Sequence, residues 1–328
     1  MPTGRSLSFT AAMLFTLLSG LPANLPTSSA QEPAELREAI DAAVAEALRE
    51  ERCRGCVVLV GRRDSILLRR AYGLRQVDPE REEMTEDTIF DLASLTKPVV
   101  TATSALLLVE RGKLNLDRPV AEYLPEFASH GKEKITPRHL LLHTSGLIPD
   151  NALSEYADGP ELAWKRLFAT RPRTALDERF TYSDVNFQVL GRLVESLAES
   201  PLDTFAAKEL FEPLGMRDTC FDPAEALRGR IAPTERQGDT WIRGRVHDPR
   251  AAALGGVAGH AGLFSTADDL ARFAQMLLGG GKLGETRVLA EKTVALGAEP
   301  HAVPGNHFRT LGWDSRSSFS SNRGASFS

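Results

Sequence analysis

The run DLASLTKPVV (residues 91–100) decides how the rest of the sequence is interpreted, because it places Ser94 three residues before Lys97 and just ahead of an apolar stretch. From residue 99 to residue 109 the chain is almost wholly apolar or small, which predicts a buried helix. Proline is tolerated only in the first turn of a helix, so Pro98 requires the helix to begin within about four residues upstream. Ser94 is therefore expected at a helix N-terminus.

The spacing of Ser94 and Lys97 is that of a nucleophile with its own base. Residues at i and i+3 of a helix share a face, so the Lys97 ammonium can reach the Ser94 hydroxyl. The free N–H groups at a helix start can also stabilise an oxyanion. To act as a base at neutral pH, Lys97 needs its pKa lowered by roughly three units, about 4 kcal/mol. The alternative is that Ser94 only caps the helix and Lys97 is solvated, since S-x-x-K occurs often by chance.

A second motif lies in FTYSDVNFQVLG (residues 180–191), where Tyr182-Ser183-Asp184 stands at the start of another predicted helix. The polar neighbours of Tyr182 indicate a turn, and a phenol there can move a proton to or from Ser94 and its leaving group. The alternative is a tyrosine with an ordinary surface role.

Composition indicates a globular protein, with 328 residues of which 42% are hydrophobic. The formal net charge is −5, and it becomes −6 if residues 1–30, which carry only Arg5, are removed. This mild acidity argues against nucleic acid or an anionic membrane as the main partner.

Residues 1–30 have the pattern of a secretory signal peptide. An apolar segment from Phe9 to Leu21 is followed by the small residues Ser28-Ser29-Ala30. The segment is too short for a stable bilayer anchor, although an uncleaved anchor is the alternative. We expect a periplasmic or secreted protein with no stable membrane anchor after cleavage.

The remaining pattern places strands toward the chain ends and helices in the middle. Apolar residues every four positions predict a helix over 34–50, and two short strands follow at Val57–Val60 and Ile66–Leu68. From about 120 to 250 the pattern predicts helices and no strand pair. A last helix is predicted from Ser265 or Thr266 to the glycines at 279–281.

Taken together, these motifs resemble those of the penicillin-recognising serine hydrolases, whose S-x-x-K motif is joined by a Y-x-N or S-D-N motif. The resemblance runs from about residue 33 to the end. It is closest to the class C β-lactamase-like branch, which includes family VIII carboxylesterases and D-aminopeptidases. The stretches that carry it are FDLASLTKPVVTA (90–102), ITPRHLLLHTSGL (135–147), FTYSDVNFQVLGRLVE (180–195), ELFEPLGMRDT (209–219) and GGVAGHAGLFSTADDLARFAQMLL (255–278).

The resemblance implies an α+β fold in which an antiparallel sheet, built from both chain ends and flanked by helices, is joined by a helical subdomain. Residues 31–328 would form one hydrolase domain, with the sheet-and-helix part at about 31–120 and 250–328 and the helical part at about 121–249. The implied roles are Ser94 as nucleophile, Lys97 as its activating partner and Tyr182 as proton shuttle. No metal or organic cofactor is implied.

Two departures from the family pattern matter. Asp184 stands where the family often has Asn, and a carboxylate accepts hydrogen bonds but cannot donate one to a substrate amide carbonyl. An ionised Asp184 would also hold Lys97 charged and oppose a base role. The third motif, K-T-G or H-T-G on a strand beside the serine, is not matched by His260-Ala261-Gly262, which precedes a helix. No aliphatic residue longer than Ala follows Trp313, so we expect the C-terminal strands, with one oxyanion donor, to be missing.

Other motifs are weaker. His139 and His143 have metal spacing, but Leu140 replaces the glutamate of the zinc-protease pattern, so we interpret both as ordinary helix residues. His247-Asp248 is interpreted as a loop pair. Cys53 and Cys56 can form a disulfide only if a turn at Gly55 brings them together.

These observations predict an exported serine hydrolase that cleaves ester or amide bonds through an acyl-enzyme on Ser94, with Asp184 at the substrate. The expected partners are small esters, peptides, β-lactams or peptidoglycan fragments, and no nucleic acid. The alternative is an inactive homologue that serves as a wall-binding or scaffold protein.

Overall fold

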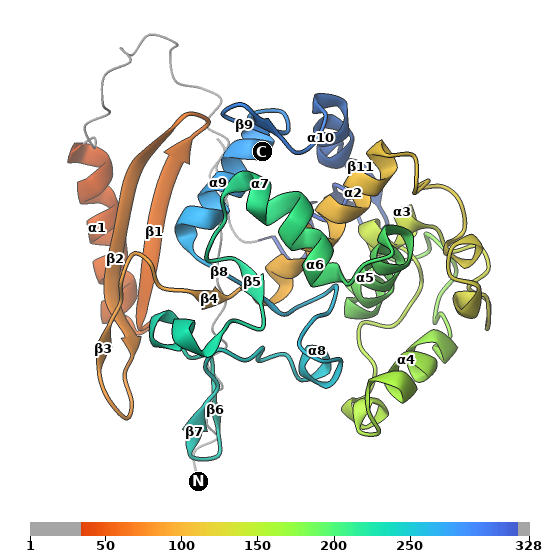
Figure 1. Cartoon of the computed structure of the whole chain (residues 1–328), viewed down its shortest axis with the longest axis horizontal. Helices are drawn as coiled ribbons and strands as arrows, with labels where there is room; N and C mark the ends of the chain where they lie inside the picture. The colour runs from red at the N-terminus through yellow and green to blue at the C-terminus, as the bar shows by residue number, and fades with distance from the viewer. Residues whose placement is uncertain (1–33, 321–328) are drawn as a thin grey trace.

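The computed structural model describes residues 34–320 (Figure 1). The expected signal peptide (1–30) and residues 321–328 lie outside the described residues. Within 34–320, no helix combines the length and the apolar character needed to cross a membrane.

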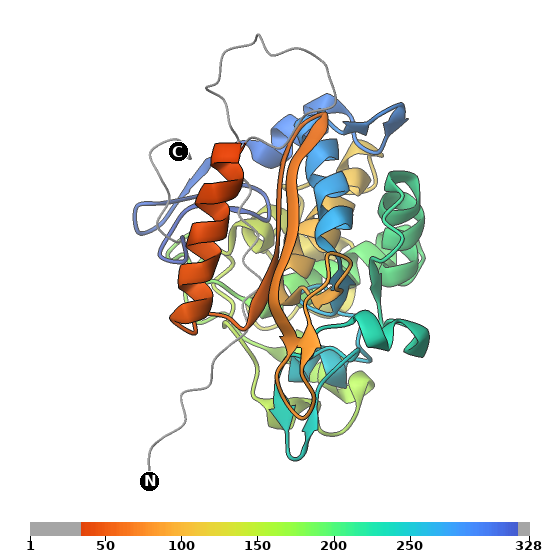
Figure 2. The ribbon, with the colours of Figure 1, turned by 90° about the vertical axis from the view of Figure 1, so that its left-hand side faces the viewer.

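The N-terminal part is an antiparallel hairpin between two helices. Helix α1 (Ala34–Arg49) leads into β1 (Gly55–Arg62) and β2 (Ser65–Gln76), and β3 (Glu82–Glu83) pairs with β2. Helix α1 lies on one side of the hairpin and α9 (Ala267–Leu278) on the other (Figure 2). The predicted helix and hairpin are confirmed, and both strands are longer than the apolar pattern indicated.

A continuous helical run through the centre of the molecule carries the S-x-x-K motif. It begins with the 3-10 turn Ala93–Leu95, continues as π-helical turns over Lys97–Ala102 and ends as α2 (Thr103–Glu110). The prediction that Ser94 stands at a helix start is confirmed. The first turns are not regular α-helix, and Pro98, which has no N–H to donate, lies among them.

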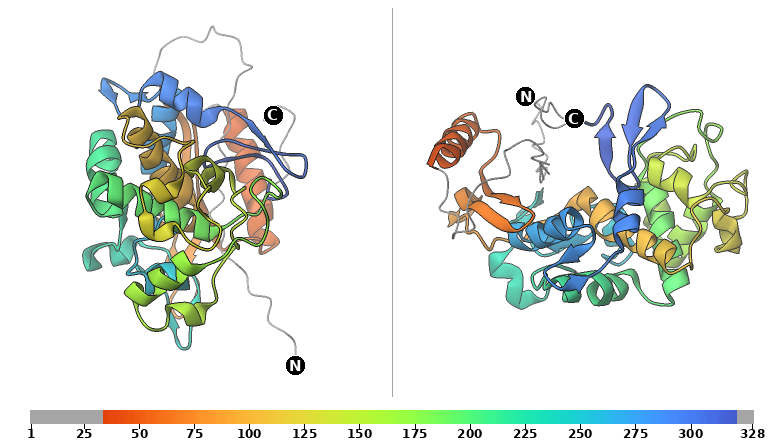
Figure 3. Two further views of the ribbon diagram at one scale, coloured as in Figure 1. Left: turned by 90° about the vertical axis from the view of Figure 1, so that its right-hand side faces the viewer. Right: turned by 90° about the horizontal axis from the view of Figure 1, so that it is seen from above.

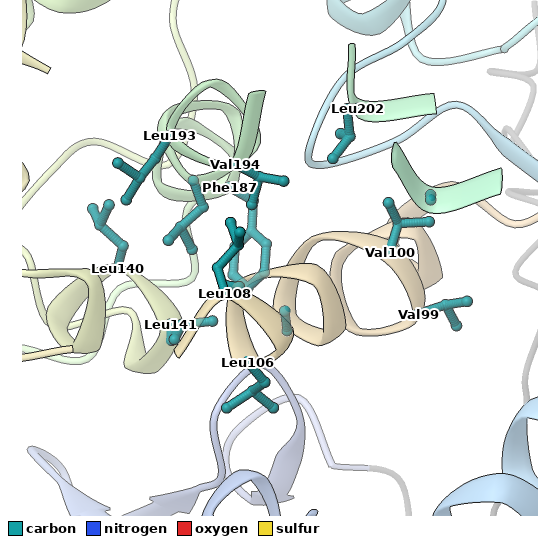
Figure 4. Close-up of a cluster of buried hydrophobic side chains, with 14 of the residues drawn as sticks. Val99, Val100, Leu106, Leu108, Leu140, Leu141, Phe187, Leu193, Val194 and Leu202 are labelled. Carbon is teal, nitrogen blue, oxygen red and sulfur yellow. The ribbon is translucent and has the colours of Figure 1, made fainter. Parts of the chain in front are cut away.

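Helices fill the middle of the chain, as predicted. The α-helices are α3 (Pro137–Leu142), α4 (Pro160–Ala169), α5 (Asp184–Ala198), α6 (Leu202–Ala206), α7 (Glu212–Leu214) and α8 (Pro249–Ala253), followed after α9 by α10 (Glu291–Ala298). Shorter turns are the 3-10 segments Val120–Glu122, Pro125–Phe127, Leu153–Tyr156 and Glu225–Arg230 and the π-helical segment Ala207–Phe211. Side chains of the central run, α3, α5 and α6 converge in the main hydrophobic core (Figure 4).

The described strands form five small sheets rather than one sheet from both chain ends. Beside β1–β2–β3 these are β4 (Phe90–Asp91), β8 (Leu263–Ser265) and β5 (Cys220–Phe221), in that order; β6 (Arg236–Gln237) with β7 (Thr240–Trp241); β9 (Lys282–Leu283) with β10 (Thr286–Arg287); and β11 (His301–Val303), β12 (His307–Arg309) and β13 (Asp314–Arg316). The C-terminal sheet β11–β12–β13 stands apart from the β1–β2 hairpin (Figure 3). The N-terminal and C-terminal parts of the chain contact each other instead at two places: β4 pairs with β8, and α9 packs on β1.

One sequence prediction about strands is wrong. The β6–β7 pair lies within 120–250, where ladders of two residues are too short to show an alternating pattern. Strand β13 follows Trp313 and pairs with β12 through its backbone, but none of its residues is buried, so the expectation that buried C-terminal strands are missing stays a prediction. The last helix is confirmed as α9, with Thr266 accepting a hydrogen bond from the Asp269 backbone N–H and Gly279 following the last turn. All three cysteines are free.

Candidate active site

The turn that presents Ser94 is fixed by its neighbours. Asp91 Oδ1 accepts a hydrogen bond from the backbone N–H of Ala93 at 2.8 Å, and Ala93 has a left-handed φ of 48°. The hydroxyl of Thr96 donates to the Ala93 carbonyl at 2.7 Å and accepts from the backbone of β8 at 3.1 Å. Ser94 is thereby exposed, whereas Lys97 is only 2% exposed. The turn places a surface hydroxyl over a buried ammonium.

The Lys97 ammonium is the centre of the site. Its Nζ donates to Ser94 Oγ at 2.9 Å and to the backbone carbonyl of His260 at 3.1 Å. Asp184 Oδ1 lies 2.6 Å from the same nitrogen, and the Tyr182 ring centroid lies 5.0 Å away. The structure thus brings together all four residues that the sequence singled out.

The start of α5 positions Tyr182 and Asp184. Ser183 caps this helix by accepting from the Asn186 backbone N–H at 3.2 Å, and its hydroxyl donates to the carbonyl of Ile148 at 2.6 Å. Asp184 is the first helical residue, where the positive end of the helix dipole favours a carboxylate. Tyr182 therefore precedes a capped helix end, and Asp184 enters the site from its first turn.

The charge on Lys97 follows from these contacts. Burial favours the neutral amine, but electrostatic attraction and hydrogen bonds from Tyr182 and Asp184 outweigh burial and raise the pKa of Lys97 above its ordinary value. Lys97 is therefore an ammonium in the resting site. The pKa depression required for a lysine base is absent, as the presence of Asp184 led us to expect.

Asp248 and His260 adjoin the site, and sequence reasoning missed their role. His260 Nε2 lies 3.0 Å from Asp248 Oδ1, while the His260 carbonyl contacts Lys97. His247 does not pair with its sequence neighbour but lies with Nδ1 3.1 Å from Asp91 Oδ2. The interpretation of His247-Asp248 as a loop pair is therefore wrong: His247 contacts Asp91, whereas Asp248 contacts His260.

Three side chains beside Lys97 are of types that bind metal ions. Among the described residues, Asp184, Asp248 and His260 each bring one ligand atom to within 4.8 Å of the others. The Lys97 ammonium lies 2.6 Å from the Asp184 carboxylate, so the protein itself supplies a positive charge beside these ligand atoms. His139 does not join such a cluster, because its Nδ1 lies 2.8 Å from Thr136 Oγ1 at the start of α3.

Comparison with known proteins identifies relatives of this chain. A 33% identical relative, the N-acetylmuramyl-L-alanine amidase of Bacillus subtilis (strain 168), aligns over 79% of this chain and 66% of its own length. A "Putative D-alanyl-D-alanine carboxypeptidase" of Salmonella agona (strain SL483) is also 33% identical, over 64% of this chain and 56% of its own. This chain thus spans less than two thirds of the length of these relatives.

A solved structure has the same fold over most of the described chain. The class C β-lactamase of Rhodobacter sphaeroides superposes with a TM-score of 0.70 and 25% identity, covering 84% of this chain and 74% of its own. The Beta-lactamase family model matches residues 40–325, which include the central helical run, the start of α5 and the loop of His260. With its S-x-x-K and Tyr-Ser-Asp motifs joined around one buried lysine, this chain belongs to the Beta-lactamase family.

Proposed function

We propose that this chain is a serine hydrolase that cleaves an amide or ester bond through an acyl-enzyme on Ser94. The observation that carries the proposal is the 2.9 Å hydrogen bond from buried Lys97 Nζ to the exposed Ser94 Oγ, with the Tyr182 ring 5.0 Å from the same nitrogen. A solvated first-turn lysine, the alternative for this motif, does not fit a side chain that is 2% exposed.

In the proposed acylation, Lys97 acts through its charge. The Tyr182 oxygen, in the phenolate form that this step requires, takes the Ser94 proton while Oγ bonds to the substrate carbonyl carbon. The tetrahedral intermediate collapses as Tyr182 gives this proton to the departing amine or alcohol. The backbone N–H of Ser94, at the start of this helical run, is the donor that we propose for the oxyanion on the Ser94 side.

Deacylation repeats these steps with water. Tyr182 takes a proton from water as the water oxygen attacks the acyl carbon, and the proton returns to Ser94 Oγ as the carboxylic acid leaves. Throughout both steps the ammonium stabilises negative charge on Oγ and on the Tyr182 oxygen.

The substrate we propose is a small peptide amide or ester, including peptidoglycan fragments. The support is that the two relatives are named as an amidase at N-acetylmuramyl-L-alanine and a D-alanyl-D-alanine carboxypeptidase. We also propose export to the periplasm or medium, because residues 1–30 have the pattern of a signal peptide. Fusion of residues 1–30 to a reporter that is active only after export tests that proposal.

The hydrolase proposal is tested on the full chain with fluorescent penicillin and a short-chain p-nitrophenyl ester. We expect covalent labelling and ester turnover in the wild type and neither in Ser94→Ala. Ser65→Ala, at the start of β2 and away from this site, is the matched control and should behave as wild type. Equal labelling of Ser94→Ala and wild type would reject Ser94 as nucleophile, and absence of both activities in the wild type would favour the inactive scaffold.

A further inference from the structure

His143 holds the backbone on both sides of Tyr182. It follows the last residue of α3 in the left-handed conformation, with φ 60° and ψ 39°. Its carbonyl accepts a hydrogen bond from the Thr181 N–H at 3.0 Å, and its ring Nδ1 accepts from the Ser183 N–H at 3.1 Å. The residues before and after Tyr182 are thus both bound to this one histidine.

The imidazole of His143 also packs against the phenol itself. The two ring centroids are 4.7 Å apart with an interplanar angle of 34°, and the Phe187 ring lies 5.2 Å from the same imidazole. His143 is 1% exposed. A side chain so enclosed has little freedom, so its contacts restrict where the Tyr182 ring can lie relative to Lys97.

The hydrogen bonds determine the protonation of the imidazole. Because Nδ1 accepts from a backbone N–H, the proton of the neutral ring is on Nε2. Burial, with the nearby positive charges of Arg309 and Lys97, lowers the pKa of His143 well below its ordinary value. The ring therefore stays neutral at neutral pH, keeps its acceptor at Nδ1 and adds no second cation beside Lys97.

We propose that His143 is a positioning residue that sets the Tyr182 phenol against Lys97 and Ser94 through the Nδ1 acceptor and the face of its ring. The inference rests on the proposed function, in which Tyr182 moves the proton. His143 itself touches neither Ser94 nor the substrate in this scheme. Any residue at position 143 could accept the hydrogen bond from Thr181, because that bond uses the backbone carbonyl. The Nδ1 acceptor and the ring contact with Tyr182 belong to the histidine side chain.

The test compares His143→Asn with His143→Leu in the full chain. Both lack the ring and have similar shape, but the Asn oxygen replaces the Nδ1 acceptor and Asn readily adopts the left-handed conformation. We expect Leu to lower the rate of Ser94 labelling by fluorescent penicillin on the order of 10²-fold, because small misplacements of reacting groups are costly. Asn should retain much more of the rate. Equal losses in both variants would overturn the role of the Nδ1 acceptor.

A double-mutant cycle shows whether His143 acts through Tyr182. In a Tyr182→Phe background, His143→Leu should cause little further loss, since the group that it positions is already gone. Independent, multiplicative losses would overturn the proposal.

A spectroscopic readout separates this inference from the proposed function. The chain has four tyrosines, Tyr72, Tyr123, Tyr156 and Tyr182, so ¹³C-tyrosine labelling gives few signals, and Tyr182→Phe assigns the one of interest. His143→Leu should shift the Tyr182 signal and leave the other three in place, with Asn restoring it in part. An unshifted Tyr182 signal would overturn the positioning role. If the wild type is not acylated at all, the hydrolase proposal fails, and this measurement still decides the role of His143.

Discussion

Asp184 Oδ1 lies 2.6 Å from the buried Nζ of Lys97, a shorter contact than the 2.9 Å hydrogen bond from the same nitrogen to Ser94 Oγ. The carboxylate therefore competes directly with any role of Lys97 as a neutral base. In the proposed mechanism the lysine serves as a fixed positive charge, and Tyr182 transfers the proton.

Replacing Asp184 by Asn tests this assignment. Without the carboxylate, the attraction and the hydrogen bond by which Asp184 raises the pKa of Lys97 are both lost, so this pKa falls. If the ammonium is the active form, the alkaline limb of the pH profile for Ser94 acylation moves to lower pH in Asp184→Asn. We expect the rate near pH 9 to fall more than the rate near pH 7.

A neutral lysine base predicts the opposite result for the same variant. Its acylation would increase at neutral pH, because more of the lysine would be unprotonated. Asp64→Asn is the control, since that side chain is 90% exposed in the turn between β1 and β2. Its pH profile should match the wild type.

Gly259 allows the loop of His260 to approach α5 and Lys97. A Cβ at position 259 would lie 2.0 Å from the Phe187 carbonyl oxygen and 2.9 Å from the Cα of Gly191. We expect Gly259→Ala to lower the free energy of unfolding by about 1–3 kcal/mol and to slow acylation, because relief of the clash displaces the His260 carbonyl from Lys97. Urea denaturation and penicillin labelling measure the two effects.

Gly229→Ala is the matched control for that variant. A Cβ at position 229 meets nothing within 4 Å, and the residue lies in a short 3-10 segment. It should change neither stability nor labelling appreciably. If Gly259→Ala were as stable and as active as this control, position 259 would not lie as close to α5 as the structure shows.

The sequence predicts the parts of the site that local geometry determines. Ser94 and Lys97 are three residues apart on one helical run, and Pro98 restricts where that run begins, so their contact follows from helix geometry. Tyr182 and Asp184 could be placed at a helix start by their polar turn, but only the family resemblance connected them to Ser94.

The contacts that sequence reasoning missed join loops across the fold. His260 contacts Lys97 through its backbone carbonyl, and every residue type has one. The identity of residue 260 therefore does not predict this contact. His143 was assigned an ordinary helix role because Leu140 replaces the glutamate of the zinc-protease pattern. The structure places it just after α3, where its ring bonds to a backbone N–H 40 residues away that local sequence does not indicate. The division of the strands into five sheets was also beyond prediction, because ladders of two or three residues leave no period to detect.

His247 makes stability depend on pH through its contact with Asp91. The hydrogen bond to this carboxylate raises the pKa of His247 in the folded chain. The contribution is therefore complete below the ordinary histidine pKa of about 6.5 and is lost as pH rises through the higher folded value. Relative to His247→Asn, which keeps a donor near Nδ1 but cannot become charged, the wild type should be more stable at pH 6 than at pH 9.

The size of that effect is limited by solvent, since the His247 side chain is 32% exposed. Urea denaturation of both proteins at the two pH values measures it. A difference in unfolding free energy that is the same at pH 6 and pH 9 would show that the pair does not depend on the imidazolium.

Lys132 is a second buried lysine, and its role is structural. Its Nζ donates to the backbone carbonyls of Ser129, Phe168 and Thr170 at 2.7, 2.8 and 3.0 Å, and the residue is 0% exposed. These bonds tie the end of α4 to the segment after Phe127. Lys132→Met keeps most of the apolar stem but leaves three carbonyls without this donor, so we expect a loss of about 2 kcal/mol in unfolding free energy.

Lys134→Met is the comparison, because Lys134 is exposed two residues along the same loop. Its thermal and urea unfolding should match the wild type within about 0.5 kcal/mol, as for most surface substitutions. Ser94 labelling at a temperature where both variants are folded should be unaffected, since Lys132 bonds to carbonyls of the helical part and not to the site. Equal stability of the two variants would mean that water replaces the ammonium between the carbonyls at no cost.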